Sequence, residues 1–171
     1  TAAELTKFVT ACNNGTYSST NLPVVTQTED IDLSGVSWTS INSFYGTYNG
    51  NGHTIKNMKT GIGGEGNATP FVRDNYGTIK NIVFTNASVF NQDGYGSAVV
   101  AGNNSSGGIV ENCSVINSTI QIGNYEGLAS VVGKNYEGAT VRNCVALNNT
   151  FRRRYGAGSK DAGGIVQINQ G

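Results

Sequence analysis

The stretches Ile79-Lys-Asn-Ile82, Val110-Glu-Asn-Cys113 and Val141-Arg-Asn-Cys144 begin at positions 79, 110 and 141, so one pattern recurs every 31 residues. The same interval continues downstream, where it separates the asparagines Asn86, Asn117 and Asn148. Self-similarity at a fixed period of roughly 20–50 residues is the signature of a repeat architecture. The sequence therefore predicts a solenoid whose coils stack equivalent residues on one another.

Each repeat contains short strands separated by bends. Ile82 and Phe84 share a face by the two-residue period of a strand, but Ile79 lies three residues before Ile82. A bend at Asn81 is therefore needed if all three point inward. Asparagine tolerates the left-handed backbone of such a bend, and its amide can bond to the same amide in the next coil. The asparagines expected at the first two bends are Asn81, Asn112, Asn143, Asn86, Asn117 and Asn148.

A third bend is marked by asparagines that each follow an apolar residue by four positions: Asn75, Asn104, Asn135 and Asn169. Three short strands and three bends per repeat predict an all-β fold, a parallel β-helix of about five coils. Val110 is expected inside it, stacked between Ile79 and Val141. Helical repeats are disfavoured because apolar residues after position 15 lack helical spacing and Asn and Gly would interrupt a helix.

The first residues predict a short helix that covers the first coil. Thr1 and Glu4 match a capping box, and one helical face carries Leu5, Phe8, Val9 and Cys12. We expect residues 1–171 to form a single module. Its expected parts are a capping helix in 1–14, strands that lead into the repeat in 15–45, and repeat coils in 46–171.

The opposite end of the sequence has no comparable helix. A last strand around Ile165, Val166 and Ile168 would leave unpaired backbone N–H and C=O groups beside an apolar core. We therefore expect the chain to be a segment of a longer protein that continues into further coils, or to associate edge to edge through this end.

Composition argues against several functional classes. Lys+Arg and Asp+Glu are both 11, so the formal net charge is zero and the chain as a whole is not expected to bind nucleic acid. No apolar run approaches the ~20 residues of a membrane span. His53 is the only histidine, and no catalytic or zinc-binding motif is present. We therefore expect no catalytic residue, metal or cofactor, and we interpret His53 as a turn residue.

Cys113 and Cys144 occupy the same position one repeat apart. Stacked strands would bring their Cα atoms to ~4.8 Å, which a disulfide accepts. The alternative is that both are small apolar side chains that fill the core, as free cysteine commonly is. We favour core packing because Met58 and Ile82 belong to the same ladder.

The segment Gly50-Asn-Gly-His-Thr-Ile55, with the glycine–aliphatic patterns in 127–135 and 163–169, resembles the GLUG-type repeats of bacterial surface proteins. This resemblance implies a right-handed parallel β-helix in an adhesin-like, extracellular or cell-surface protein. It implies no catalytic residues. Gln167 departs from the pattern because it stands where the motif usually has glycine.

The strongest candidate binding site is the coil that is lengthened by three residues, since Asn135 and Asn169 are 34 apart. Insertions in solenoids form protruding loops, often on the binding face. Arginine and tyrosine there suit an acidic or sulfated glycan, through bidentate bonds and stacking. The alternative is a merely solvated loop. The candidate residues are Arg152, Arg153, Arg154, Tyr155, Lys160 and Asp161.

Tyr76 and Tyr136 each follow a ladder asparagine and are further candidates for stacking on sugars. By contrast, Asp93, Glu126 and Asp161 are spaced by 33 and 35 residues, which does not match the ladder. These acids are not expected to converge on a calcium ion or to act as an acid–base pair.

The sequence thus predicts a non-catalytic structural or binding module whose partner is a glycan or a host or surface protein. The alternative is a β-helical polysaccharide lyase or hydrolase, because this architecture also supports such chemistry. An enzyme of that kind would need carboxylates and a basic residue converging on one outer face.

Overall fold

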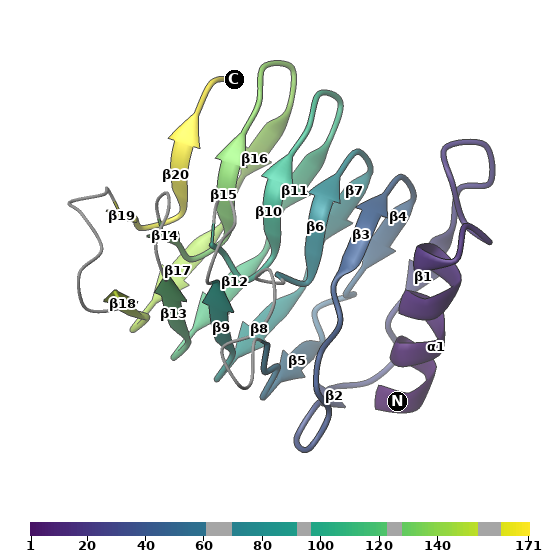
Figure 1. Cartoon of the computed structure of the whole chain (residues 1–171), viewed down its shortest axis with the longest axis horizontal. Helices are drawn as coiled ribbons and strands as arrows, with labels where there is room; N and C mark the ends of the chain where they lie inside the picture. The colour runs from purple at the N-terminus through teal and green to yellow at the C-terminus, as the bar shows by residue number, and fades with distance from the viewer. Residues whose placement is uncertain (61–69, 92–96, 123–127, 154–161) are drawn as a thin grey trace.

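A computed structural model describes residues 1–60, 70–91, 97–122, 128–153 and 162–171 of the chain. The fold is an all-β parallel β-solenoid with one N-terminal helix, α1 (Ala2–Asn13), as the sequence predicted. Figure 1 shows the strands stacked in rows along the long axis, with α1 at one end. No helix in the described ranges is long and apolar enough to span a bilayer.

Helix α1 begins with the predicted capping box. The Thr1 hydroxyl accepts a hydrogen bond from the Glu4 N–H, and the Glu4 carboxylate accepts from the Thr1 backbone nitrogen at 2.9 Å. Its buried face, Leu5, Val9 and Cys12, packs on the first coil.

Three sheets of five parallel strands form the sides of the solenoid. The first contains β1 (Val24–Thr26), β4 (Thr47–Asn49), β7 (Thr78–Lys80), β11 (Ile109–Glu111) and β16 (Thr140–Arg142). The second contains β3 (Ile41–Phe44), β6 (Val72–Asn75), β10 (Ala101–Asn104), β15 (Val132–Asn135) and β20 (Val166–Asn169). The third contains β2 (Ile31–Asp32), β5 (Thr54–Lys56), β8 (Val83–Thr85), β12 (Ser114–Ile116) and β17 (Val145–Leu147).

Two smaller sheets complete the described fold. One has the order β18 (Thr150–Arg153), β13 (Thr119–Ile122), β9 (Ser88–Asn91), and the other pairs β14 (Leu128–Ala129) with β19 (Ala162–Gly163). Strands β1, β2 and β3 lie within residues 15–45, which were expected only to lead into the repeat. They already form the first strand of each large sheet.

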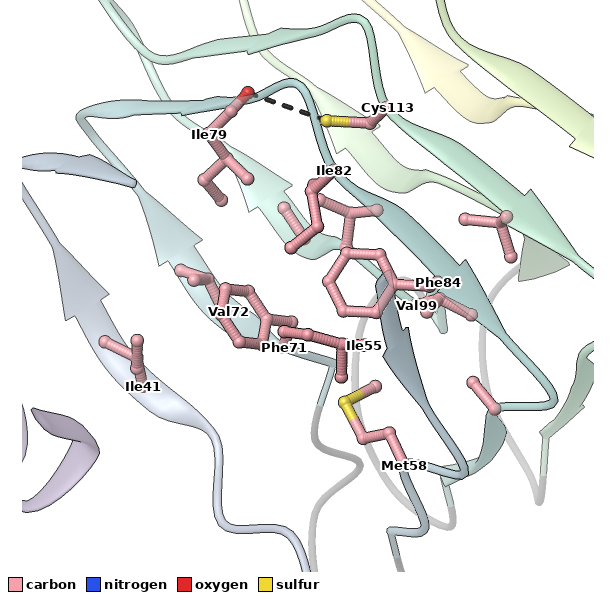
Figure 2. Packing of buried hydrophobic residues seen from close by; sticks show 14 of the residues in the cluster. Ile41, Ile55, Met58, Phe71, Val72, Ile79, Ile82, Phe84, Val99 and Cys113 are labelled. Carbon is pink, nitrogen blue, oxygen red and sulfur yellow. Dashed lines mark hydrogen bonds between the residues drawn. The ribbon is translucent and has the colours of Figure 1, made fainter. Parts of the chain in front are cut away.

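The core follows the 31-residue register. Val110 pairs with Ile79 in β7 and with Val141 in β16, and Val115 pairs with Phe84. Ile79, Val110 and Phe84 are completely buried, so equivalent positions form internal apolar ladders. Figure 2 shows Ile79, Ile82 and Phe84 among the side chains that fill the tube.

The bends carry the asparagines at the expected positions. All six adopt φ between 52° and 55°, the left-handed conformation that asparagine tolerates better than most residues: Asn81, Asn86, Asn112, Asn117, Asn143 and Asn148. The Asn112 amide donates to the Asn81 amide oxygen at 2.9 Å. The Asn81 amide in turn donates to Asn49 at 3.0 Å, which links three successive coils at one bend.

A second asparagine ladder runs inside the third bend. The side-chain N–H groups of Asn75, Asn104 and Asn135 each donate to the amide oxygen of the next ladder asparagine at 2.8 Å, ending at Asn169. Asn75, Asn104 and Asn135 are buried, and each also donates to a backbone carbonyl. Their polar groups are therefore satisfied without water.

Strands β16, β17, β18 and β20 stand at the outer edges of their sheets. Here the inward-facing Val141, Ala146 and Phe151 are only half-buried, and Leu147 on the outer face is 50% exposed. The expected pairing of this end with further strands stays a prediction.

Candidate ligand-binding face

The candidate loop of the lengthened coil lies mostly outside the described residues, which omit 154–161. Arg152 is exposed in β18, and Arg153 ends that strand. Arg154, Tyr155, Lys160 and Asp161 lie outside the described ranges, as do Asp93 and Glu126. The proposal of a glycan site in this loop therefore stays a prediction.

A different constellation is present on the second sheet, where tyrosines follow the buried asparagine ladder. Because the Tyr76 N–H bonds to Phe44 O, Ser105 N–H to Asn75 O and Tyr136 N–H to Asn104 O, the residues after the ladder stack in successive coils. The stacked residues are Tyr45, Tyr76, Ser105 and Tyr136. We call this row the tyrosine row.

The backbone after the ladder asparagine explains why the row sits at a sharp corner. Gly46 and Gly77 follow Tyr45 and Tyr76, and a Cβ atom on Gly77 would collide with the Gly46 carbonyl oxygen. Only glycine permits so close an approach of successive coils. The tyrosine before it is thereby turned out of the core, and Tyr76 is 43% exposed.

The first two rings of the row, Tyr45 and Tyr76, pack against each other. The Tyr45 and Tyr76 rings stack with their centroids 4.9 Å apart and an interplanar angle of 10°. Ser105 carries no ring at the next position, so no tyrosine from the adjacent coil covers the second face of Tyr76. Two coil steps, about 10 Å, separate the positions of Tyr76 and Tyr136, which leaves one ring-sized step vacant in the row.

A polar row runs beside the tyrosine row, two residues earlier in each coil. Ser43, Asp74, Asn103 and Lys134 are paired in register along β3, β6, β10 and β15. The Lys134 ammonium lies 4.3 Å from the centroid of the Tyr136 ring, which shows that the two rows are within side-chain reach.

Hydrogen bonds order part of this polar row. The Asp74 carboxylate accepts from the Asn103 amide at 2.7 Å and from the Arg73 guanidinium at 3.0 Å. The Asn103 amide oxygen is buried and has no hydrogen-bond partner within the described part of the chain. An acceptor in this state is unusual, because buried polar groups are normally paired.

The arrangement suits binding better than acid–base chemistry. The Asp74 carboxylate is already engaged by the Arg73 guanidinium and the Asn103 amide. Glu111 is likewise engaged by Arg142 on the first sheet. Over the described ranges, no three His, Cys, Asp or Glu side chains come close enough together to hold a metal ion.

Sequence reasoning found part of this face. Tyr76 and Tyr136 were identified because each follows a ladder asparagine. Tyr45 was missed because Phe44 replaces asparagine in the first coil. The signal that would have found it is the shared Tyr-Gly pair, Tyr45-Gly46 and Tyr76-Gly77.

His53 lies in the turn after Gly52, as interpreted from the sequence, with its Nδ1 3.5 Å from an Asp30 carboxylate oxygen. Both thiols of the cysteine pair are free, with Cys113 buried and Cys144 half-buried.

Comparison with known proteins supports the fold. No protein-family model matches the sequence, and no curated protein matches it. A solved structure from Bacteroides ovatus, a protein that carries the provisional name immunoglobulin A1 protease, superposes with a TM-score of 0.62. The sequence identity is 20%, and the match covers 90% of this chain and 50% of that one. At this identity the likeness shows the shared β-solenoid fold, and this chain spans about half the length of its structural neighbour.

Proposed function

We propose that the chain is a non-catalytic binding module of a secreted or cell-surface protein, and that the tyrosine row with its neighbouring polar row binds a glycan. The observation that carries the proposal is the Tyr76 ring, which is 43% exposed and stacks on Tyr45 with one face, while Ser105 places no ring against the other. The adhesin-like role implied by the resemblance to GLUG-type repeats belongs to the same proposal.

The chemistry of the face fits a sugar ring. Pyranose rings present a C–H face that stacks on aromatic rings and hydroxyl groups at their rim that need hydrogen-bond partners. Tyr76 supplies the aromatic face at the coil where Ser105 leaves room. Lys134 supplies a cationic donor at the rim, whereas the Asn103 amide oxygen is buried.

The rigid backbone favours such binding energetically. Tyr45 and Tyr76 are already stacked, and the strands below them are joined by parallel pairing and by the buried asparagine ladder. Because these side chains are already ordered, little conformational entropy is lost when the ligand binds.

The first test replaces the uncovered ring. We expect Tyr76→Ala to weaken glycan binding at least tenfold, about 1.4 kcal/mol, because it removes the stacking surface. Tyr76→Phe keeps the ring and should bind within about twofold of the wild type. The measurement is binding to an array of neutral and acidic oligosaccharides, followed by calorimetry on any oligosaccharide that is bound.

Leu22→Ala serves as a control for this test because Leu22 is 57% exposed and lies between α1 and β1, away from the tyrosine row. Equal affinity of Tyr76→Ala and wild type, with both proteins folded, would contradict the proposed site.

We also propose that this module has no catalytic activity. We expect no turnover of acidic or neutral polysaccharides and no cleavage of peptide substrates, because Asp74 and Glu111 are each engaged by an arginine. Product formation that rises with enzyme concentration and is lost in Asp74→Asn would establish the alternative, a β-helical enzyme.

A further inference from the structure

Cys113 and Cys144 occupy equivalent positions in successive coils. Each follows a left-handed asparagine and precedes a strand, β12 and β17, which pair in parallel from Ser114 with Val145 onward. The Cys113 thiol lies 3.7 Å from the Ile79 carbonyl oxygen, as Figure 2 shows. The Cys144 thiol lies 3.8 Å from the carbonyl oxygen of Val110, the residue that pairs with Ile79.

The expected distance between the two Cα atoms matches that of a disulfide. Strands that pair in parallel hold equivalent Cα atoms ~4.8 Å apart, and disulfides span Cα distances of roughly 4.4–6.8 Å. Both side chains take the same direction, because each thiol also donates to the carbonyl two residues earlier, Glu111 or Arg142, at 3.3 Å. Formation of the bond requires both side chains to rotate from their carbonyl acceptors toward each other.

The two thiols differ in access and in acidity. Cys113 is completely buried, whereas Cys144 is half-buried beside β17, the outermost strand of its sheet. A hydrogen bond from the Cys113 thiol lowers the pKa of Cys144. The same hydrogen bond, together with burial, raises the pKa of Cys113. The thiolate therefore forms on the thiol that a small molecule can reach.

We propose that Cys113 and Cys144 are a reversible disulfide pair that ties the coil of β16 and β17 to the coil before it. The disulfide forms by exchange with a low-molecular-weight disulfide such as oxidised glutathione. The pair is independent of the tyrosine row, which lies on a different sheet, so the proposal does not rest on the glycan-binding function.

The exchange is balanced in two steps. The Cys144 thiolate attacks one sulfur of oxidised glutathione, forms a mixed disulfide and releases one glutathione thiolate. Cys113 then loses its proton and attacks the Cys144 sulfur, which releases the second glutathione thiolate. Two cysteine thiols are oxidised to one disulfide, and one glutathione disulfide is reduced to two glutathione molecules, which take up the two protons.

The bond closes a loop of 31 residues, since the cysteines stand at 113 and 144. A cross-link of this length restricts the unfolded chain. It joins a coil at the edge of the sheets, where Val145 and Leu147 are about half exposed, to a coil whose inward-facing Val110 and Val115 are completely buried. We expect oxidation to raise the midpoint of thermal unfolding by roughly 5 °C or more.

The test incubates the folded protein with oxidised glutathione and follows its intact mass and its non-reduced peptides. The expected product has lost two hydrogen atoms, contains one peptide pair joined through Cys113 and Cys144, and returns to the starting mass with a reductant. Cys144→Ser should remain unreacted, whereas Cys113→Ser should stop at the glutathione adduct on Cys144.

Cys12→Ala is the matched control. Cys12 lies on the buried face of α1 at the other end of the solenoid, and burial raises its pKa to about 11, so its replacement should leave the exchange unchanged. Three free thiols after prolonged incubation, or a wild-type glutathione adduct that never resolves, would overturn the proposal. Oxidation without any rise in the unfolding temperature would overturn the structural role of the bond.

Discussion

Replacement of Val110 by aspartate is expected to unfold the whole domain. Val110 is completely buried between Ile79 and Val141, and nothing in this ladder can pair with a carboxylate. Burial of an unpaired charge costs several kcal/mol even after relaxation, and the apolar contribution of valine, roughly 2 kcal/mol, is lost as well. The sum is comparable to the total stability of a typical domain, about 5–15 kcal/mol.

Ile109→Asp is the matched control for Val110→Asp. Ile109 is the preceding residue of β11 and is only half-buried, because it points to the opposite side of the strand. We expect this variant to stay folded by circular dichroism and by size-exclusion elution, whereas Val110→Asp loses strand signal or aggregates. A soluble, native-like Val110→Asp protein would contradict the register.

Replacement of Asn104 by alanine is expected to cost about 3–5 kcal/mol of unfolding free energy. The Asn104 amide donates to the Asn135 side chain at 2.8 Å, to Gly108 O at 3.2 Å and to Thr140 O at 3.0 Å. It also accepts from Asn75 at 2.8 Å. Removal deprives the buried Asn75 and Asn135 side chains of these bonds.

The exposed asparagine ladder provides the comparison for Asn104→Ala. Asn112 has a left-handed backbone and bonds to Asn81 at the surface, so Asn112→Gly keeps the backbone conformation and removes only an exposed bond. We expect a loss below about 1 kcal/mol. Chemical denaturation of both variants measures the difference, and a cost for Asn104→Ala as small as that for Asn112→Gly would mean that the buried ladder does not stabilise the fold.

The sequence predicted the fold because each coil obeys the same physical constraints. A bend between two inward-facing side chains requires a left-handed residue, so asparagine recurs at Asn81, Asn112 and Asn143 and reveals the period. The capping box at Thr1 and Glu4 likewise predicted α1 from purely local chemistry.

The candidate face was predicted only in part because its parts obey weaker constraints. An outward side chain is not required by packing, so Tyr45, Tyr76 and Tyr136 follow no strict interval, and Ser105 interrupts their row. The vacant step at Ser105 exists only once the coils are stacked, and no local sequence pattern predicts it. Strands β1 to β3 were predicted only as strands that lead into the repeat, because this segment lacks the left-handed asparagine bends of later coils.

The most direct test of glycan binding by the tyrosine row is a map of backbone amide chemical-shift changes during titration with an oligosaccharide that the array identifies. We expect the largest shifts to cluster on residues 74–77, 103–105 and 134–136, which include the tyrosine row and the polar row beside it. The Tyr76→Ala variant should lose these shifts while it keeps the rest of its spectrum. Shifts confined to residues 152–161, or no saturable shift with any oligosaccharide, would contradict glycan binding by this face.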